Sequence, residues 1–164
     1  MILQKKLEYS FIAIIILALS AFLLNTYNSY SFKHNPLPQS YIDKIEAKEQ
    51  EILSNMQKNF GFVYKFPIII TDKIPGRLYG LSSYRDGDIK IYLNKKVMQE
   101  SMDYILSDVV AHEYAHALLF KLNHFDKKDG HSNIWQQTCT KLGGENCRRY
   151  VDTQEIIMSK IPFK

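Results

Sequence analysis

The sequence of 164 residues predicts an α+β domain preceded by one transmembrane helix. An uncharged apolar segment lies near the amino terminus, strand-like runs follow in the middle of the chain, and apolar residues recur at helical spacing on either side of those runs. The composition, 46% hydrophobic and 23% charged, is typical of a globular chain and excludes a disordered or fibrous one. A net charge of +4 is too small to indicate nucleic-acid binding.

Residues 10–32 contain no charged side chain and are expected to span a membrane, because about 20 apolar residues cross the ~30 Å hydrocarbon core. Lys5 and Lys6 precede this segment and only Lys33 follows it closely, which favours a cytoplasmic amino terminus and a periplasmic or extracellular domain. A cleaved signal peptide is the alternative. Its small-residue cleavage site, at 18–20, would fall inside the apolar block, so we expect an uncleaved single-pass anchor.

A proline-containing linker follows, and the folded domain is expected to begin near Ser40. Ser40 with Asp43 resembles an amino-terminal cap, and the helical apolar spacing continues to Phe60, where Gly61 ends the helix. The expected organisation is a cytoplasmic segment (1–9), a transmembrane anchor (10–32), a linker (33–39) and a folded domain (40–164).

Two strand signals come next. Residues 66–71, Phe-Pro-Ile-Ile-Ile-Thr, predict a strand buried on both faces. Residues 78–84 and 88–93 flank Arg-Asp-Gly at 85–87 and predict a β-hairpin whose second arm alternates apolar and polar side chains. We therefore expect a small antiparallel sheet with one face on the core.

The segment 109–120 contains His112-Glu-Tyr-Ala-His116, the HExxH pattern. Residues four apart share one face of a helix, so both imidazoles can bind a single ion, whereas Glu113 can reach a water molecule but is poorly placed as a ligand. A buried helix with hydrogen-bonded histidines is the structural alternative. Burying two imidazoles and a carboxylate on an apolar helix is costly, and zinc offsets that cost. The pattern predicts one Zn²⁺ per chain, with Glu113 as the general base.

A catalytic zinc needs a third protein ligand. Leu119 and Leu122 stand where an extended metzincin motif requires Gly and His, so that arrangement is excluded. His131 is the preferred candidate because it lies between a tight turn and a predicted helix at 134–142, and His124 is its main competitor. The acidic candidates are Asp126, Asp129, Glu145 and Glu155.

Together these residues resemble the SprT-like zinc metallopeptidases over about 89–143. The resemblance is carried by the HExxH helix and by Asp129-Gly-His131, Trp135 and Leu142-Gly143. It implies a minimal zincin-like fold in which the sheet packs on the HExxH helix. It also implies peptide-bond hydrolysis with Glu113 as catalytic base and three zinc ligands, namely His112, His116 and His131. The chain departs from the family in having Ser132 in place of the usual Gly and in having too few cysteines for the four-cysteine zinc ribbon that follows many such domains.

The expected function is a membrane-anchored zinc metallopeptidase with a protein or peptide substrate and no clear nucleic-acid partner. The strand at 89–93 is expected to bind an extended peptide by edge pairing. Arg148, Arg149 and Tyr150 are the candidates for stabilising the oxyanion. One alternative is a non-catalytic zinc-binding assembly factor, against which an intact Glu113 argues. The other is a cytosol-facing protease acting on crosslinked or misfolded proteins.

The only two cysteines, Cys139 and Cys147, flank Gly143-Gly144. In an oxidising compartment they can close a small loop by a disulfide worth roughly 2–3 kcal/mol. In the cytosol they would remain thiols. A bridge would therefore agree with a domain outside the cytoplasm.

Overall fold

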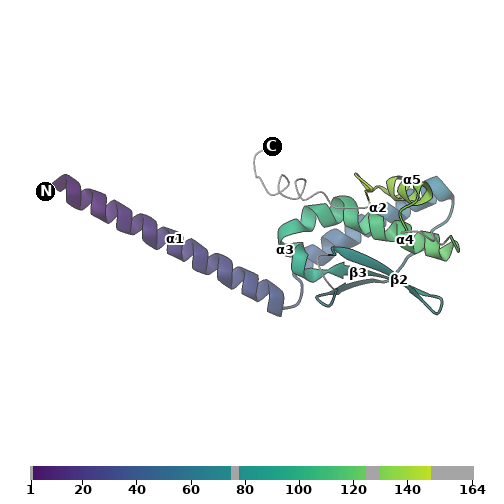
Figure 1. Ribbon diagram of the computed structural model, residues 1–164, viewed down its shortest axis with the longest axis horizontal. Coiled ribbons are helices and arrows are strands. Elements are labelled where there is room, and N and C mark those ends of the chain that lie inside the picture. The colour runs from purple at the N-terminus through teal and green to yellow at the C-terminus, as the bar shows by residue number, and fades with distance from the viewer. Residues whose placement is uncertain (1, 75–77, 125–129, 149–164) are drawn as a thin grey trace. The chain divides into compact units, whose positions relative to one another are not determined.

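The computed structural model describes residues 2–74, 78–124 and 130–148 (Figure 1). The chain divides into two compact units, Met1–Pro36 and Leu37–Lys164. The first unit is built from one helix, α1, Ile2–His34. The described part of the second unit contains the sheet and the remaining helices.

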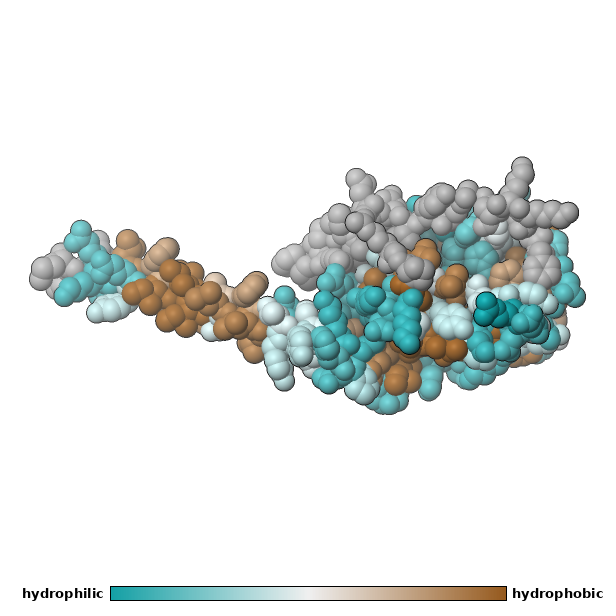
Figure 2. All heavy atoms as spheres, turned by 60° about the horizontal axis from the view of Figure 1, so that its bottom comes forward, coloured by the Kyte–Doolittle hydropathy of each residue, from teal (hydrophilic) through white to brown (hydrophobic). Residues whose placement is uncertain are grey.

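Helix α1 has 33 residues, which corresponds to a length of about 50 Å at 1.5 Å per residue. It is long and apolar enough to cross a membrane, and none of its most apolar window is buried in the structure. Apolar side chains cover the middle of the helix in Figure 2. A signal sequence near the amino terminus has the same properties. The helix extends past the predicted boundary at residue 32, so the residues outside helices before the next element are 35–38.

Helix α2, Gln39–Phe60, begins directly after Pro38. The predicted cap at Ser40 is wrong, because Pro38 occupies the cap position, two residues earlier, and no side chain caps the helix. Gln39 Nε2 instead donates to Asp43 Oδ1 at 2.8 Å. Gly61, with φ of +79°, ends the helix as predicted. The apolar side of α2 provides part of the core through Ile45, Ile52 and Met56.

Strands β1 (Ile68–Thr71), β2 (Gly80–Arg85) and β3 (Asp88–Asn94) form one sheet in the order β1-β3-β2. The β2–β3 hairpin is confirmed, and its turn residues Asp86 and Gly87 both have positive φ. β1 pairs with β3 in parallel, so the sheet is mixed rather than wholly antiparallel.

The strand order corrects the prediction for the strand at 66–71. β1 lies at an edge of the sheet, and Ile69 is exposed, so burial on both faces is wrong. The physical reason is that the helices α2, α4 and α5 lie on one side of the sheet (Figure 1). Ile89, Ile91 and Leu93 of β3 are buried, which confirms the alternation predicted for that strand.

Three helical segments follow β3 without interruption. α3 (Lys95–Tyr104) leads into a π-helical turn, η1 (Ile105–Val109), and then into α4 (Val110–Lys121), which carries the HExxH residues. The sequence predicts a helix around the HExxH pattern, but it predicts neither α3 nor the π-helical turn. α5 (Asn133–Leu142) begins at Ser132, whose hydroxyl accepts a hydrogen bond from the Trp135 amide, and ends at Gly143. α4 is largely buried and packs against β2, β3, α2 and α5. The α+β class is confirmed.

Candidate metal centre

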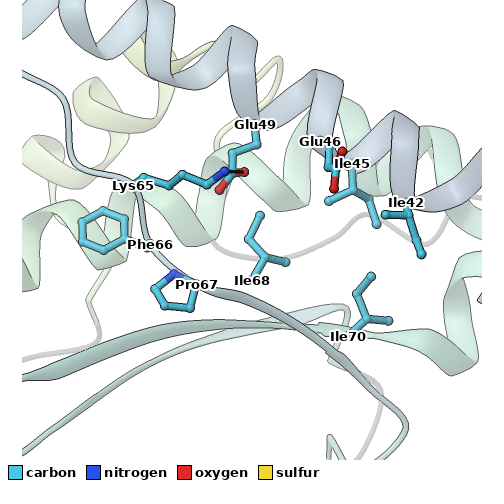
Figure 3. A pocket seen from close by; sticks show the side chains of 9 residues that line it. All are labelled: Ile42, Ile45, Glu46, Glu49, Lys65, Phe66, Pro67, Ile68 and Ile70. Carbon is cyan, nitrogen blue, oxygen red and sulfur yellow. Dashed lines mark ion pairs between the residues drawn. The ribbon is translucent and has the colours of Figure 1, made fainter. Parts of the chain in front are cut away.

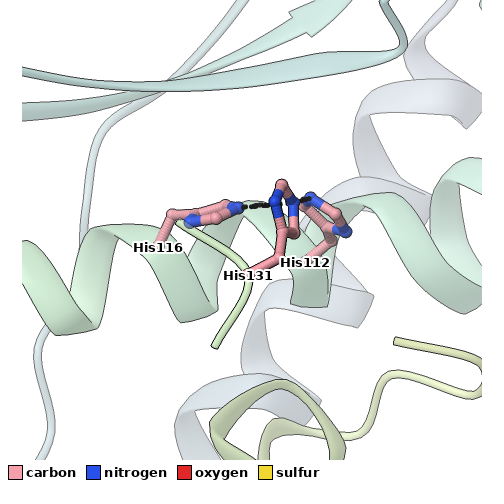
Figure 4. A group of neighbouring side chains, drawn as sticks. All are labelled: His112, His116 and His131. Carbon is pink, nitrogen blue, oxygen red and sulfur yellow. Dashed lines mark hydrogen bonds between the residues drawn. The ribbon is translucent and has the colours of Figure 1, made fainter. Parts of the chain in front are cut away.

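Three histidine side chains converge on one point (Figure 4). The Nε2 atoms of His112 and His116 are 3.3 Å apart, those of His116 and His131 are 3.2 Å apart, and those of His131 and His112 are 3.1 Å apart. All three residues are half-buried. The triangle of nitrogens is therefore nearly equilateral, with every vertex a metal-ligating atom.

The dimensions of this triangle fit a zinc ion. In a tetrahedral site with Zn–N bonds of 2.0–2.1 Å, two ligand nitrogens are separated by roughly 3.3–3.4 Å, close to the distances in the structure. Three imidazoles with a fourth position left for water form the donor set typical of catalytic zinc. The residues present thus suit zinc in both chemistry and spacing.

The local fold explains how the third histidine reaches the other two. His112 and His116 lie one helical turn apart on α4, and His131 lies between Gly130 and the first turn of α5. Gly130 has φ of +76°, and a Cβ atom there would lie 3.2 Å from Cε1 of His116. A glycine at this position therefore lets the loop approach the His116 ring closely.

Trp135 forms an aromatic platform for the histidines. Its ring centroid lies 4.6 Å from that of His112, 5.2 Å from that of His116 and 4.5 Å from that of His131. The side chain is buried, and its Nε1 atom has no hydrogen-bond partner among the residues that the structure describes. Such packing restricts the rotamers of all three imidazoles and so preorganises the site.

Burial keeps two of the imidazoles neutral. It lowers the pKa of His112 to about 4 and that of His116 to about 3, and neighbouring histidines of the cluster add to both shifts. The carboxylate of Asp108 acts in the opposite direction on His112. At neutral pH both rings therefore have a lone pair for a metal, which is the form that zinc requires.

Glu113 is buried, and its carboxylate contacts β2. The Ser82 hydroxyl lies 2.9 Å from Oε2 of Glu113 and 2.7 Å from its backbone oxygen, and it donates to both. Burial raises the pKa of the Glu113 carboxyl to about 7, although the Ser82 hydrogen bonds lower it. A carboxylate with a pKa near 7 suits a general base. The sequence analysis missed Ser82, although alternation along 78–84 places it on the same strand face as Gly80.

The comparison with protein families gives a match. The model of the SprT-like family matches residues 47–155, about two thirds of the chain. The chain belongs to the SprT-like family. Membership indicates a zincin-like, protease-related function and metal binding at that level. No similar curated protein and no similar solved structure was found.

In this SprT-like domain, a disulfide and hydrogen bonds connect the segment after α5 to α5 and η1. Cys139 and Cys147 form a disulfide with their Cα atoms 5.8 Å apart. Asp108, a buried residue of η1, accepts two hydrogen bonds from Asn146, one from the backbone nitrogen at 2.7 Å and one from the side-chain Nδ2 at 3.3 Å. Asp108 lies one turn before His112, so these contacts connect the carboxyl-terminal end of the described chain to the helical segment that carries His112 and His116. Asp108 was not predicted from the sequence.

Several predicted site residues lie away from the cluster. His124 is exposed, lies three residues after the end of α4 and is absent from the cluster. Glu145 is also exposed and absent from the cluster, and its backbone nitrogen donates to Ser107 O. Arg148 is exposed near the end of the described chain. The remaining candidates lie outside the described residues: Asp126, Asp129, Arg149, Tyr150 and Glu155.

The prediction that the strand at 89–93 binds a peptide by edge pairing is wrong, as the order of strands in the sheet shows. β3 is the central strand and pairs on both sides, so it has no edge to offer. The described edge next to the SprT-like ligand helix belongs to β2, which contacts α4 through Ser82. At its far end, the rings of Tyr84 and Phe120 lie 6.1 Å apart, and Phe120 stacks on His116 at 6.4 Å.

Proposed function

We propose that this SprT-like chain is a membrane-anchored zinc metallopeptidase that hydrolyses peptide bonds. The observation that supports this most strongly is the close triangle of His112, His116 and His131 imidazoles with the buried Glu113 carboxylate on the same helix. A metal site held only for structure is usually closed by four protein ligands, and the described residues supply three.

His112, His116 and His131 would hold the zinc. When bound, zinc supplies a Lewis acid that polarises the scissile carbonyl and lowers the pKa of water towards neutrality. Glu113 takes the proton of the attacking water and transfers it to the leaving amine. Ser82 fixes the orientation of the Glu113 carboxylate through its hydrogen bond to Oε2.

The substrate is an extended peptide that pairs with the outer edge of β2, which no strand in the described part of the chain occupies. Backbone pairing at a sheet edge gives affinity with little sequence selectivity, which suits a protease for unfolded segments. Tyr84 and Phe120 form an apolar wall beside His116 at the same edge. Edge pairing would bring a scissile bond between β2 and the histidines.

Helix α1 serves as an uncleaved anchor. Lys5 and Lys6 before the apolar segment keep the amino terminus in the cytoplasm and place the enzyme domain in the periplasm or outside the cell. The disulfide between Cys139 and Cys147 agrees with an oxidising compartment.

The test uses the full chain purified in detergent. We expect about one zinc per chain by metal analysis, hydrolysis of unfolded casein, loss of hydrolysis after chelation and recovery when zinc is restored. If the protein binds zinc but cleaves neither casein nor a peptide library, the proposal is wrong and the non-catalytic assembly factor replaces it.

A further inference from the structure

An apolar groove of about 360 Å³ lies between α2 and β1, outside the metal centre (Figure 3). The side chains of Ile68 and Ile70 point from β1 towards α2. Its walls are mainly aliphatic and aromatic, and it is lined by Ile42, Ile45, Glu46, Glu49, Lys65, Phe66, Pro67, Ile68 and Ile70. Neither the metal site nor the proposed substrate strand uses this groove.

One border of the groove is an unpaired strand edge. β1 pairs with β3 on one side, where Ile91 N donates to Pro67 O at 2.9 Å. In a parallel pair, alternate residues bond to the neighbouring strand, so the backbone groups of Ile68 and Ile70 face the other way. No strand within the described ranges pairs with that outer edge. The groove therefore offers hydrogen-bonding backbone groups next to apolar side-chain space.

The charges of the groove favour a basic occupant. Glu49 is already engaged, because its carboxylate accepts from Tyr114 Oη at 2.5 Å and pairs with Lys65 Nζ at 3.0 Å. Glu46 lies in the same lining and forms no ion pair with any residue that the structure describes. A basic side chain of an occupant would therefore form an ion pair with the Glu46 carboxylate.

We propose that this groove binds an extended segment of a partner protein, which adds as a strand to the outer edge of β1. Two aliphatic side chains of that segment, two residues apart, would lie between α2 and β1, and a basic side chain on the same face would pair with Glu46. β1 has four residues, about 13 Å, so the bound segment has four to five residues. A lipid chain fits less well, because it would leave the edge groups of Ile68 and Ile70 covered and unpaired. Binding here needs no hydrolysis and goes beyond the proposed function.

The probe is a fluorescein-labelled peptide, Lys-Ser-Val-Ser-Val-Ser-Lys, in which the valines and lysines share one face of a strand. Binding is measured by fluorescence anisotropy with the full-length Glu113→Gln protein in detergent, so that the probe is not cleaved. We expect saturable binding that is the same with and without zinc. A peptide with Glu in place of both Lys, and the Glu46→Lys protein, should each weaken binding at least tenfold. Asp103 is an exposed residue of α3, outside the groove lining, so Asp103→Lys is the matched control and should leave the affinity unchanged.

Methylation of the peptide amides tests the pairing directly without altering the protein. Methylating the amide nitrogens that face β1 should abolish binding, whereas methylating the alternate set should preserve it. No binding, equal binding of the two methylated peptides, or an affinity unaffected by Glu46→Lys would each overturn the proposal. Binding that requires zinc would place the peptide in the metal cleft and overturn it as well.

Discussion

Replacing Gly80 by Ala should displace the Glu113 carboxylate while leaving the histidine cluster in place. A Cβ atom at residue 80 would lie 2.8 Å from Cγ of Glu113, 2.9 Å from its Oε1 and 2.9 Å from Cγ1 of Val109. The backbone of Gly80 is outside the left-handed region, so Ala is tolerated conformationally and only the space is at issue. Gly80→Ala therefore tests the position of the proposed general base, Glu113, separately from the proposed histidine ligands.

The size of the effect follows from these distances. Ordinary contacts begin near 3.4 Å, so each of the three neighbours must retreat by about 0.5 Å or more. Overpacking of this kind costs about 1–3 kcal/mol of stability. A displacement approaching 1 Å in a catalytic group can lower the rate about a hundredfold. We expect a loss of kcat of about tenfold to a hundredfold with zinc content unchanged.

The assay compares kcat on a fluorogenic peptide with zinc content for the wild-type chain and Gly80→Ala. Ser83→Thr is the control, because it adds one methyl group to the same strand on the opposite face. Full activity in Gly80→Ala would refute the proposed position of Glu113. Loss of zinc together with activity would also refute it, since the disturbance would then have reached the ligands.

The other predictions concern the ligands, proton binding and the compartment. His131→Ala should lower zinc affinity roughly a hundredfold or more, whereas His124→Ala should not change it, because only His131 joins the cluster. Competition with a chromophoric chelator measures the zinc affinity of both variants. A larger loss of affinity in His124→Ala than in His131→Ala would make His124 the ligand instead. The metal-free protein should lose thermal stability as the pH falls from about 6.5 towards 3, since His116 takes up a proton in the unfolded chain at its ordinary pKa but stays neutral in the folded one, where its pKa is about 3. Melting temperatures recorded at half-unit steps check this, with a shallower decline expected for His116→Ala; a flat profile for the native chain would contradict it. Labelling of isolated membranes under denaturing conditions should find Cys139 and Cys147 unreactive until reductant is added, and immediate labelling would place the domain in a reducing compartment.

Local patterns in the sequence predicted the elements well where the decisive interactions are local. The turn at Asp86-Gly87 has both the residue types and the positive φ values of a two-residue hairpin, and Gly61 and Gly143 end their helices. The His112 and His116 spacing likewise depends only on the helical repeat. These features require no knowledge of how distant segments pack.

Features that depend on long-range packing could not be predicted from local sequence patterns. The run at 66–71 is apolar enough for a central strand, but pairing with β3 in parallel leaves β1 at the edge. The alternation in β3 shows which side chains are buried but does not show that both edges of the strand are paired. Ser82 contacts Glu113 across 31 positions of sequence, a relation that strand periodicity cannot supply.

The most direct test of the central claim is hydrolysis by Glu113→Gln compared with the native chain, both purified at full length in detergent and loaded with zinc. Gln keeps the size of the side chain but cannot take a proton from water, and residue 113 lies outside the triangle of ligand nitrogens. We expect about one zinc per chain in both proteins and a loss of peptide hydrolysis of about 10²-fold or more in the variant. Equal hydrolysis by the two zinc-loaded proteins would contradict it.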